Sequence, residues 1–167
     1  MAYMAKIQTF DGKTIRICRS DPAQEPNAGI VIMHEAFGMN DHIRDICDRY
    51  ARLGYLVVSP ALYDRVEFGL EVPGYGELDL EKALELRKAA NWDHSVNDMQ
   101  VAIDLAREAG PVGVVGYCWG GSLAWLAGTR CNVDSVVSYY GGQITKFING
   151  YGCVIYINGI SVLSLTF

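Results

Sequence analysis

Features of secreted and membrane proteins are missing from this sequence. No apolar run reaches the length of about 18 residues that a membrane-spanning helix needs. Residues 1–16 have no apolar segment followed by a small-residue cleavage site, so we predict no signal peptide. The five cysteines form no Cys-x-x-Cys pair and are odd in number, which argues against a disulfide framework and a zinc site. We therefore expect a cytoplasmic protein without a metal ion, another cofactor or a membrane contact.

A basic surface is missing as well. Lysine and arginine number 14 against 19 aspartates and glutamates, and with the three histidines neutral the formal net charge is −5. Nucleic acids are bound by clustered Lys and Arg side chains, so we predict no nucleic-acid partner. With 50% hydrophobic and 20% charged residues, the composition is that of a folded protein. The 167 residues make about one average domain, and they leave open whether it is a monomer or a homo-oligomer.

Short apolar runs and helical patterns alternate along the chain. Alternating apolar and polar residues flank Asp11 and Gly12, which predicts a hairpin with a two-residue turn. The apolar runs at 30–33, 55–58, 112–115 and 133–140 are typical of buried strands. Helical periodicity is present at 43–51, 78–91, 95–109 and 120–128. The alternation predicts an α/β fold with a mostly parallel sheet flanked by helices.

Capping residues mark the ends of the predicted helices. Asn40 or Asp41 can cap the first helix, and Gly54 suits its left-handed end. Residues 95–98 come close to a capping box, which predicts that a later helix begins there and ends at Gly110.

The charges are unevenly distributed. Every Asp, Glu, Lys and Arg lies in residues 1–146, and residues 147–167 contain none. Strands are predicted at 154–157 and 162–165. We divide the chain into a core, 1–146, and an atypical tail, 147–167, which is either part of the same domain or disordered. The tail is typical of a truncated or foreign end, so we expect a C-terminally incomplete fold.

The sharpest chemical signal follows the third parallel strand. Ligands bind beyond the carboxyl ends of such strands. Three segments are predicted to follow these ends: residues 34–38, 62–65 and 116–121. The last segment contains Gly-x-Cys-x-Gly before a small-residue helix, the pattern of a nucleophile elbow with Cys in place of Ser. Large side chains at Gly116 and Gly120 would clash in so tight a turn. Cys118 would then lie at the positive end of a helix, where a thiolate is favoured.

A buried structural cysteine is the alternative interpretation of Cys118. For the other four cysteines we adopt that interpretation, because each lies in a periodic apolar segment or in the tail. These residues are Cys18, Cys47, Cys131 and Cys153.

Four segments together carry a family resemblance. They are residues 32–40 (Ile-Met-His-Glu-Ala-Phe-Gly-Met-Asn), 59–63 (Ser-Pro-Ala-Leu-Tyr), 116–121 (Gly-Tyr-Cys-Trp-Gly-Gly) and 138–141 (Ser-Tyr-Tyr-Gly). With these motifs in this order, roughly residues 5–145 resemble the dienelactone hydrolase family, a cytoplasmic branch of the α/β-hydrolase fold. The resemblance implies a three-layer α/β-hydrolase-like fold. It also implies a carboxylic ester hydrolase acting on a lactone or ester of a small carboxylic acid.

The resemblance assigns roles to individual residues. Cys118 matches the nucleophile, and Glu35 matches a glutamate that helps to deprotonate the thiol when substrate binds. The backbone amides of Ala36 and Trp119 match the oxyanion hole. A solvated carboxylate at a strand end is the alternative interpretation of Glu35.

The proton-relay half of the family's site is not found. The family places an acid and then a histidine after the nucleophile, whereas His34, His42 and His94 all precede Cys118. The only later acid, Asp134, begins a predicted strand and so lies at the opposite edge of the sheet. We expect His34 to face the sheet packing, His42 to lie in the first turn of a helix, and His94 to precede a helix.

A thiol without a base is a poor catalyst, because a free Cys has a pKa of about 8.5 and forms little thiolate at neutral pH. A catalytically inactive, truncated homologue that serves as a binding or interaction module is therefore the alternative function. A redox-active thiol is a third possibility, weakened because no second cysteine lies beside Cys118 in the sequence.

Other residues carry weaker predictions. Arg65 and Tyr63 are candidates for substrate binding at the mouth of the pocket, although an exposed loop arginine is the simpler interpretation of Arg65. Arg87 lies in the mid-chain helices, where members of the family that take dienelactone carry a carboxylate-binding arginine. Trp92 and Trp119 could line a pocket or belong to the core.

Overall fold

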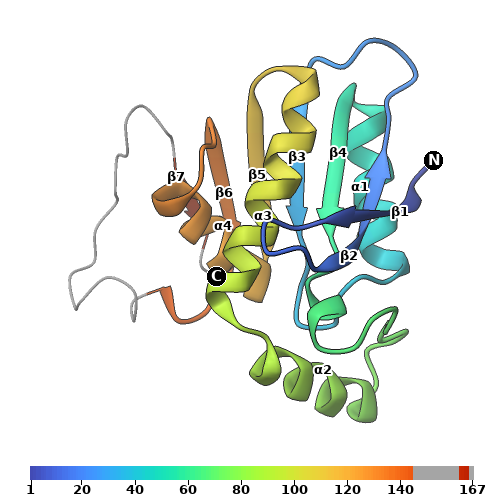
Figure 1. Ribbon diagram of the computed structural model, residues 1–167, viewed down its shortest axis with the longest axis vertical. Coiled ribbons are helices and arrows are strands. Elements are labelled where there is room, and N and C mark those ends of the chain that lie inside the picture. Colours follow the sequence, from blue (N-terminus) through green and yellow to red (C-terminus); the bar gives the residue numbers. More distant parts are fainter. Residues whose placement is uncertain (145–161, 166–167) are drawn as a thin grey trace.

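A mixed sheet of seven strands forms the centre of the molecule (Figure 1). The computed structural model describes residues 1–144 and 162–165. The strand order is β1-β2-β4-β3-β5-β6-β7. The β1–β2 and β2–β4 pairs are antiparallel and the remaining pairs are parallel. The strands are β1 (Tyr3–Gln8), β2 (Thr14–Ser20), β3 (Ala28–Met33), β4 (Tyr55–Pro60), β5 (Val112–Tyr117), β6 (Ser135–Tyr139) and β7 (Val162–Leu165).

Helices cover both faces of the sheet. Helices α3 and α4 pack on one face, and α1 packs on the other against β2, β3 and β4. Helix α2 lies apart from these layers, beyond the carboxyl ends of β3 and β4 (Figure 1). This architecture confirms the predicted three-layer α/β fold. The helices are α1 (Asp41–Arg52), α2 (Glu77–Ala89), α3 (Trp92–Ala106) and α4 (Trp119–Arg130), with short 3-10 turns η1 (Leu62–Arg65) and η2 (Arg107–Ala109).

Several predicted helix ends are confirmed. The Oδ1 atom of Asn40 accepts a hydrogen bond from the Ile43 amide (3.2 Å) and caps α1. Gly54 follows α1 with φ 93°, a conformation that glycine adopts at little cost. Helix α3 ends at Ala106, before the predicted end, and Gly110, with φ 97°, follows the 3-10 turn that continues it.

The hairpin turn is longer than predicted. Gln8 pairs with Thr14, so residues 9–13 connect the two strands. The Thr9 amide donates to the Lys13 carbonyl (2.9 Å), and the Gly12 amide donates to the Thr9 carbonyl (2.9 Å). The predicted two-residue turn at Asp11 and Gly12 is wrong, because Thr9 and Lys13 close the loop outside them.

The start of α3 also differs from the prediction. Asn91 is its N-cap, since its Oδ1 accepts a hydrogen bond from the His94 amide (3.0 Å). The predicted capping box at 95–98 is wrong, and His94 lies in the first turn of the helix rather than before it. Asn caps a helix at least as well as Ser, which explains the earlier start. Asp98, the acid of the predicted box, is instead fully buried.

The strand predicted at 162–165 is confirmed as β7, which pairs with β6 from Val136↔Val162 to Tyr139↔Leu165. The other strand of the tail, predicted at 154–157, lies outside the described residues. In the described part of the chain, every helix is too short or too polar to cross a lipid bilayer.

Candidate active site

Cys118 occupies a sharp turn between β5 and α4. Its backbone has φ 54° and ψ −116°, a region in which a non-glycine residue is strained. The Cys118 amide donates to the Tyr139 carbonyl (3.0 Å), which ties the turn to β6. A Cβ atom on Gly116 would overlap the Gly120 carbonyl oxygen, and one on Gly120 would overlap that of Met33. Close backbone contacts therefore require both glycines of the Gly-x-Cys-x-Gly pattern.

The thiol opens into a cavity of about 310 Å³. Cys118 is partly exposed, and residues from four separate segments share the lining. Arg87 is the cationic side chain among the described lining residues. The lining consists of Ala36, Leu84, Arg87, Cys118, Trp119, Ser122, Gly142 and Gln143.

A tight turn after β3 carries Ala36 to the cavity. The Gly38 amide donates to the Glu35 carbonyl (3.1 Å), and Gly38 has φ 77°. The phenol of Tyr63, from η1, donates to the Ala36 carbonyl (2.8 Å). Its ring stacks on Trp119 with centroids 5.2 Å apart and an interplanar angle of 11°. One buried tyrosine thus contacts both Ala36 and Trp119.

The buried side chain of His34 also stabilises this turn. Its Nε2 accepts a hydrogen bond from the Leu62 amide (3.3 Å), so Nδ1 carries the ring proton and donates to the Glu35 carbonyl (2.8 Å). Burial lowers the pKa of His34 to about 4, because a charged ring would be desolvated. His34 is therefore neutral and faces the interior, as predicted.

Two backbone amides beside the thiol remain available. In the part of the chain that the structure describes, no acceptor is found for the amides of Ala36 and Trp119. Trp119 opens α4, and the first amides of a helix have no partner within the helix. Free amides at a helix start attract negative charge.

Glu35 is held by two tyrosines that the sequence analysis missed. The Tyr140 phenol donates to Oε1 of Glu35 (2.8 Å), and the Tyr75 phenol donates to Oε2 (3.4 Å). Tyr140 belongs to the Ser-Tyr-Tyr-Gly motif, which was the available signal. Tyr75 lies in an irregular loop without any such signal.

The other histidines and the late acid are absent from the described lining of the cavity at Cys118. The His42 ring lies 6.3 Å from the ring of Tyr75. His42, in the first turn of α1, and His94, in the first turn of α3, are both exposed. The Asp134 carboxylate accepts hydrogen bonds from the Val112 amide (2.7 Å) and from Arg107 (2.9 Å). Val112 begins β5 whereas Cys118 follows its end, so Asp134 lies at the opposite edge of the sheet, as predicted.

Arg65 is engaged elsewhere. Its side chain is 12% exposed and binds Asp98 (2.6 Å) and Asp11 (2.8 Å), so the idea of an exposed loop arginine is wrong. Arg65 does not line the cavity at Cys118, and Tyr63 is buried behind Ala36 and Trp119. Their contacts give no support to direct substrate binding by either residue.

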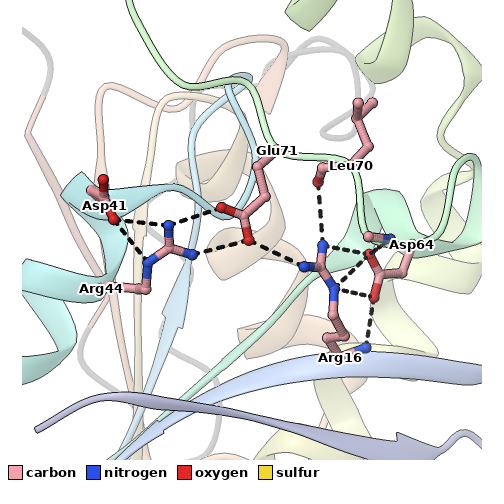
Figure 2. A network of polar contacts seen from close by, with 7 residues as sticks. Arg16, Asp41, Arg44, Asp64, Leu70 and Glu71 are labelled. Carbon is pink, nitrogen blue, oxygen red and sulfur yellow. Dashed lines mark hydrogen bonds and ion pairs between the residues drawn. The ribbon is translucent and has the colours of Figure 1, made fainter.

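Ion pairs fasten the loop between η1 and α2 to the sheet (Figure 2). Arg16 of β2 binds Asp64 (2.9 Å) and Glu71 (3.1 Å). Arg44 of α1 binds Glu71 (2.8 Å) and Asp41 (2.9 Å). Glu71 therefore joins β2 to α1, and the chain that follows it carries Tyr75 to Glu35 and then enters α2, which supplies Leu84 and Arg87.

Within the described residues, no group of three or more His, Cys, Asp and Glu side chains is placed to hold a metal ion.

A protein-family comparison matches residues 15–154 to the dienelactone hydrolase family. The chain is 38% identical over 144 residues to a carboxymethylenebutenolidase of Pseudomonas putida, covering 84% of this chain and 61% of the relative. It is 34% identical over 124 residues to carboxymethylenebutenolidase 1 of Cupriavidus pinatubonensis, covering 72% and 53%. The chain thus spans about three fifths or less of the length of these relatives.

A solved structure shares the same arrangement of elements. It is the "Putative Dienelactone Hydrolase" of Klebsiella pneumoniae, with a TM-score of 0.67 and 27% identity over 84% of this chain and 60% of that one.

Proposed function

Because the chain belongs to the dienelactone hydrolase family, we propose that it hydrolyses a lactone or ester of a small carboxylic acid with Cys118 as the nucleophile. One observation carries this proposal. Cys118 lies in a strained turn at the start of α4, and its thiol opens into the cavity that Ala36 and Trp119 also line. A structural cysteine needs neither the strained backbone nor the opening.

The cavity suits a covalent mechanism. The Sγ atom of Cys118 attacks the carbonyl carbon, and the amides of Ala36 and Trp119 donate hydrogen bonds to the oxyanion that forms. The S–C bond forms, the C–O bond to the leaving group breaks, and the alkoxide takes up the proton that left the thiol. Water then attacks the thioester, which releases the carboxylic acid and returns a proton to the sulfur.

The proton from the thiol needs an acceptor. We assign this part to Glu35, which precedes Ala36 and whose carboxylate is oriented by Tyr75 and Tyr140. The histidines are less suited to it, since His34 is neutral and enclosed and none of the three lies in the described lining of the cavity at Cys118.

Arg87 favours a substrate whose acyl group carries a carboxylate in addition to the ester or lactone that is cleaved. Its guanidinium lies 5.6 Å from the centre of the Trp92 ring and lines the cavity with Cys118. A carboxylate on the acyl group can accept paired hydrogen bonds from a guanidinium. The substrates would therefore be soluble, anionic lactones or esters.

Hydrolysis of two aryl esters tests the proposal. We expect the wild type to cleave an aryl hemisuccinate faster than an aryl acetate, and Cys118→Ala to lower both rates by about 100-fold or more. Arg87→Gln should remove the preference for the hemisuccinate. The control is Cys131→Ala, a partly buried cysteine away from the cavity, which should change neither rate. Equal rates for the wild type and Cys118→Ala would reject the thiol mechanism.

A non-catalytic binding protein is the second candidate. All three histidines precede Cys118 in the sequence and none lies in the described cavity lining, so a proton relay through histidine has no support. In that case the cavity would bind a small dicarboxylate such as succinate through Arg87, without turnover of either ester. Calorimetric titration with succinate, beside the rate measurements, separates the two candidates.

A further inference from the structure

Two fully buried cysteines face each other where α1 packs on β2. Cys18 lies in β2 and Cys47 in α1, and both side chains are 0% exposed. They belong to the same apolar cluster on the α1 side of the sheet. Their thiols are hydrogen-bonded to each other, with Cys47 as the donor. The proposed hydrolysis uses neither of these thiols.

A hydrogen bond between the two elements lies on one side of this cysteine pair. Alternate residues of a strand share a face, so Ser20 points toward α1 as Cys18 does. The Ser20 hydroxyl donates to Oδ1 of Asp48 at 2.6 Å, and Asp48 directly follows Cys47 in α1. Strand β2 and helix α1 are therefore joined directly beside the two thiols.

An ion-pair network lies on the other side of the pair (Figure 2). Arg16, two positions before Cys18 in β2, binds Glu71 (3.1 Å), and Arg44 of α1 binds the same carboxylate (2.8 Å). Arg44 lies three positions before Cys47, so the two share a face of the helix. The cysteines are thus the middle contact of three between β2 and α1, and the outer two fix their register.

The two thiols differ in acidity. The hydrogen bond from Cys47 lowers the pKa of Cys18 despite its burial, and the positive charge of Arg44 lowers it further. The same hydrogen bond and burial raise the pKa of Cys47. The thiolate is the nucleophilic form of cysteine. Cys18 is therefore placed to react first with an oxidant, and Cys47 is placed to attack the oxidised sulfur.

We propose that Cys18 and Cys47 are a redox-active dithiol, which hydrogen peroxide oxidises to a disulfide that joins β2 to α1. The Cys18 thiolate attacks one peroxide oxygen, so that an S–O bond forms, the O–O bond breaks and hydroxide leaves with the proton that Cys18 gave up. The Cys47 sulfur then attacks the sulfenic sulfur, so that the S–S bond forms, the S–O bond breaks and a second water leaves. Two thiols are oxidised by two electrons in total, and one peroxide is reduced to two waters. A thiol reductant reverses the reaction.

Burial determines which oxidants can react with the pair. Both sulfurs are enclosed, so an oxidant reaches them only when α1 opens locally from β2. Hydrogen peroxide, which is scarcely larger than water, needs a smaller opening than a disulfide reagent does. Once Cys18 is oxidised, its partner is already in contact, and an S–S bond of about 2.05 Å requires only a short approach of the two sulfurs.

Peptide mapping after peroxide treatment tests the proposal, which does not depend on Cys118 as a nucleophile. The full chain is reduced, treated with hydrogen peroxide, blocked with iodoacetamide and digested with trypsin without reductant. Trypsin releases the two cysteines in separate peptides, residues 17–19 and 45–49. We expect these peptides to be linked, with the mass of two hydrogens lost, at about 10-fold the level of any other cysteine link. Dithiothreitol should separate them.

Variants and an unfolded sample serve as controls. Cys47→Ala should abolish the linked peptide. Cys131→Ala should retain it, because Cys131 packs on the other face of the sheet, and Cys118→Ala should retain it in the absence of the exposed thiol. The wild type treated in urea should give a mixture of links, because an unfolded chain holds no pair in register. That same mixture from the native chain, or Cys18 oxidised to a sulfinic acid without a link, would overturn the proposal. This comparison of native and urea-treated wild type decides even if a variant does not fold.

Thermal unfolding shows whether the disulfide fits the native fold. The bond would close the loop from Cys18 to Cys47 and so restrict the unfolded chain. We expect the midpoint of the oxidised protein to rise by about 5 °C or more and to return after reduction. Cys47→Ala, treated in the same way, should show no rise. A linked protein with an unchanged or lower midpoint would show that the bond distorts the fold, and the pair would then not be a preformed redox site.

Discussion

At the scale of single residues, His34 shows how a histidine can serve a site without titrating in it. Both ring nitrogens are used, one accepting from the Leu62 amide and the other donating to the Glu35 carbonyl. The ring also lies against Tyr63 and Trp119, with centroids 5.2 Å and 5.6 Å away. Protonation at Nε2 would break the bond to Leu62 and leave a charge in the core.

The buried His34 should make the protein sensitive to acid. Its native pKa is about 4, against about 6.5 in an unfolded chain. Between these values the unfolded state binds a proton that the native state does not. The free energy of unfolding should therefore decrease as the pH falls from about 6.5 to about 4, by at most about 3 kcal/mol. Urea denaturation at a series of pH values measures this.

The variant His34→Gln should flatten the pH dependence, whereas His42→Gln, at an exposed site, should retain it. An unchanged dependence in His34→Gln would assign the acid sensitivity to other groups. An NMR titration that showed the His34 ring protonating above about pH 6 would contradict the prediction directly.

At the scale of secondary-structure elements, the loops between strands and helices bring most of the side chains to the candidate site. The loop from η1 to α2 has irregular backbone, yet it delivers Tyr75 to Glu35 and orients α2 over the cavity. Glu71 anchors it between Arg16 and Arg44 (Figure 2). The side chains of Arg16 and Arg44 are 14% and 24% exposed, so these pairs are better shielded from solvent than ordinary surface ion pairs.

Removing this anchor should loosen the loop before it unfolds the protein. We expect Glu71→Ala to increase the rate of proteolytic cleavage within residues 66–76 by about 3- to 10-fold, since local opening becomes easier by about 1 kcal/mol. The control is Glu67→Ala in the same loop, whose ion pair with Lys82 is exposed and 3.7 Å long. Equal cleavage in the two variants would remove the anchoring role of Glu71.

At the scale of the whole molecule, the described residues cover the two faces of the sheet unequally. Helices α3 and α4 bury one face over most of its width, and α1 covers the other face at β2, β3 and β4. Adjacent residues of β6 show the difference. Val136 is fully buried with the α3–α4 cluster, and Val137 is only partly buried on the α1 side.

A pair of charge insertions measures this asymmetry. Val136→Lys should destabilise the protein by about 3 kcal/mol or more, because an unpaired ammonium would be buried. Val137→Lys should cost about 1 kcal/mol or less, since the long side chain can reach water. Denaturant midpoints of the two variants check the prediction, and similar losses would show that both faces are equally closed.

The amino-acid sequence by itself determined the strand–helix order, the sharp turn at Cys118 and the cap at Asn40. These features depend on apolar periodicity, on glycines that no larger residue can replace, and on side-chain-to-backbone bonds between near neighbours. The family likewise followed from short motifs. The sequence did not determine where α3 begins. Asn91 and Ser95 can both cap a helix, and only the local geometry selects one of them.

Only the tertiary structure decided which side chains share the site. Tyr140 and Tyr75 meet at Glu35 from positions 65 residues apart, about which sequence periodicity carries no information. From the sequence, Arg65 was the candidate for substrate binding, and Arg87 was noted only through the family resemblance. Folding pairs Arg65 with Asp98 and Asp11 and leaves Arg87 at the cavity, because a guanidinium is satisfied by whichever carboxylates the packing brings within reach.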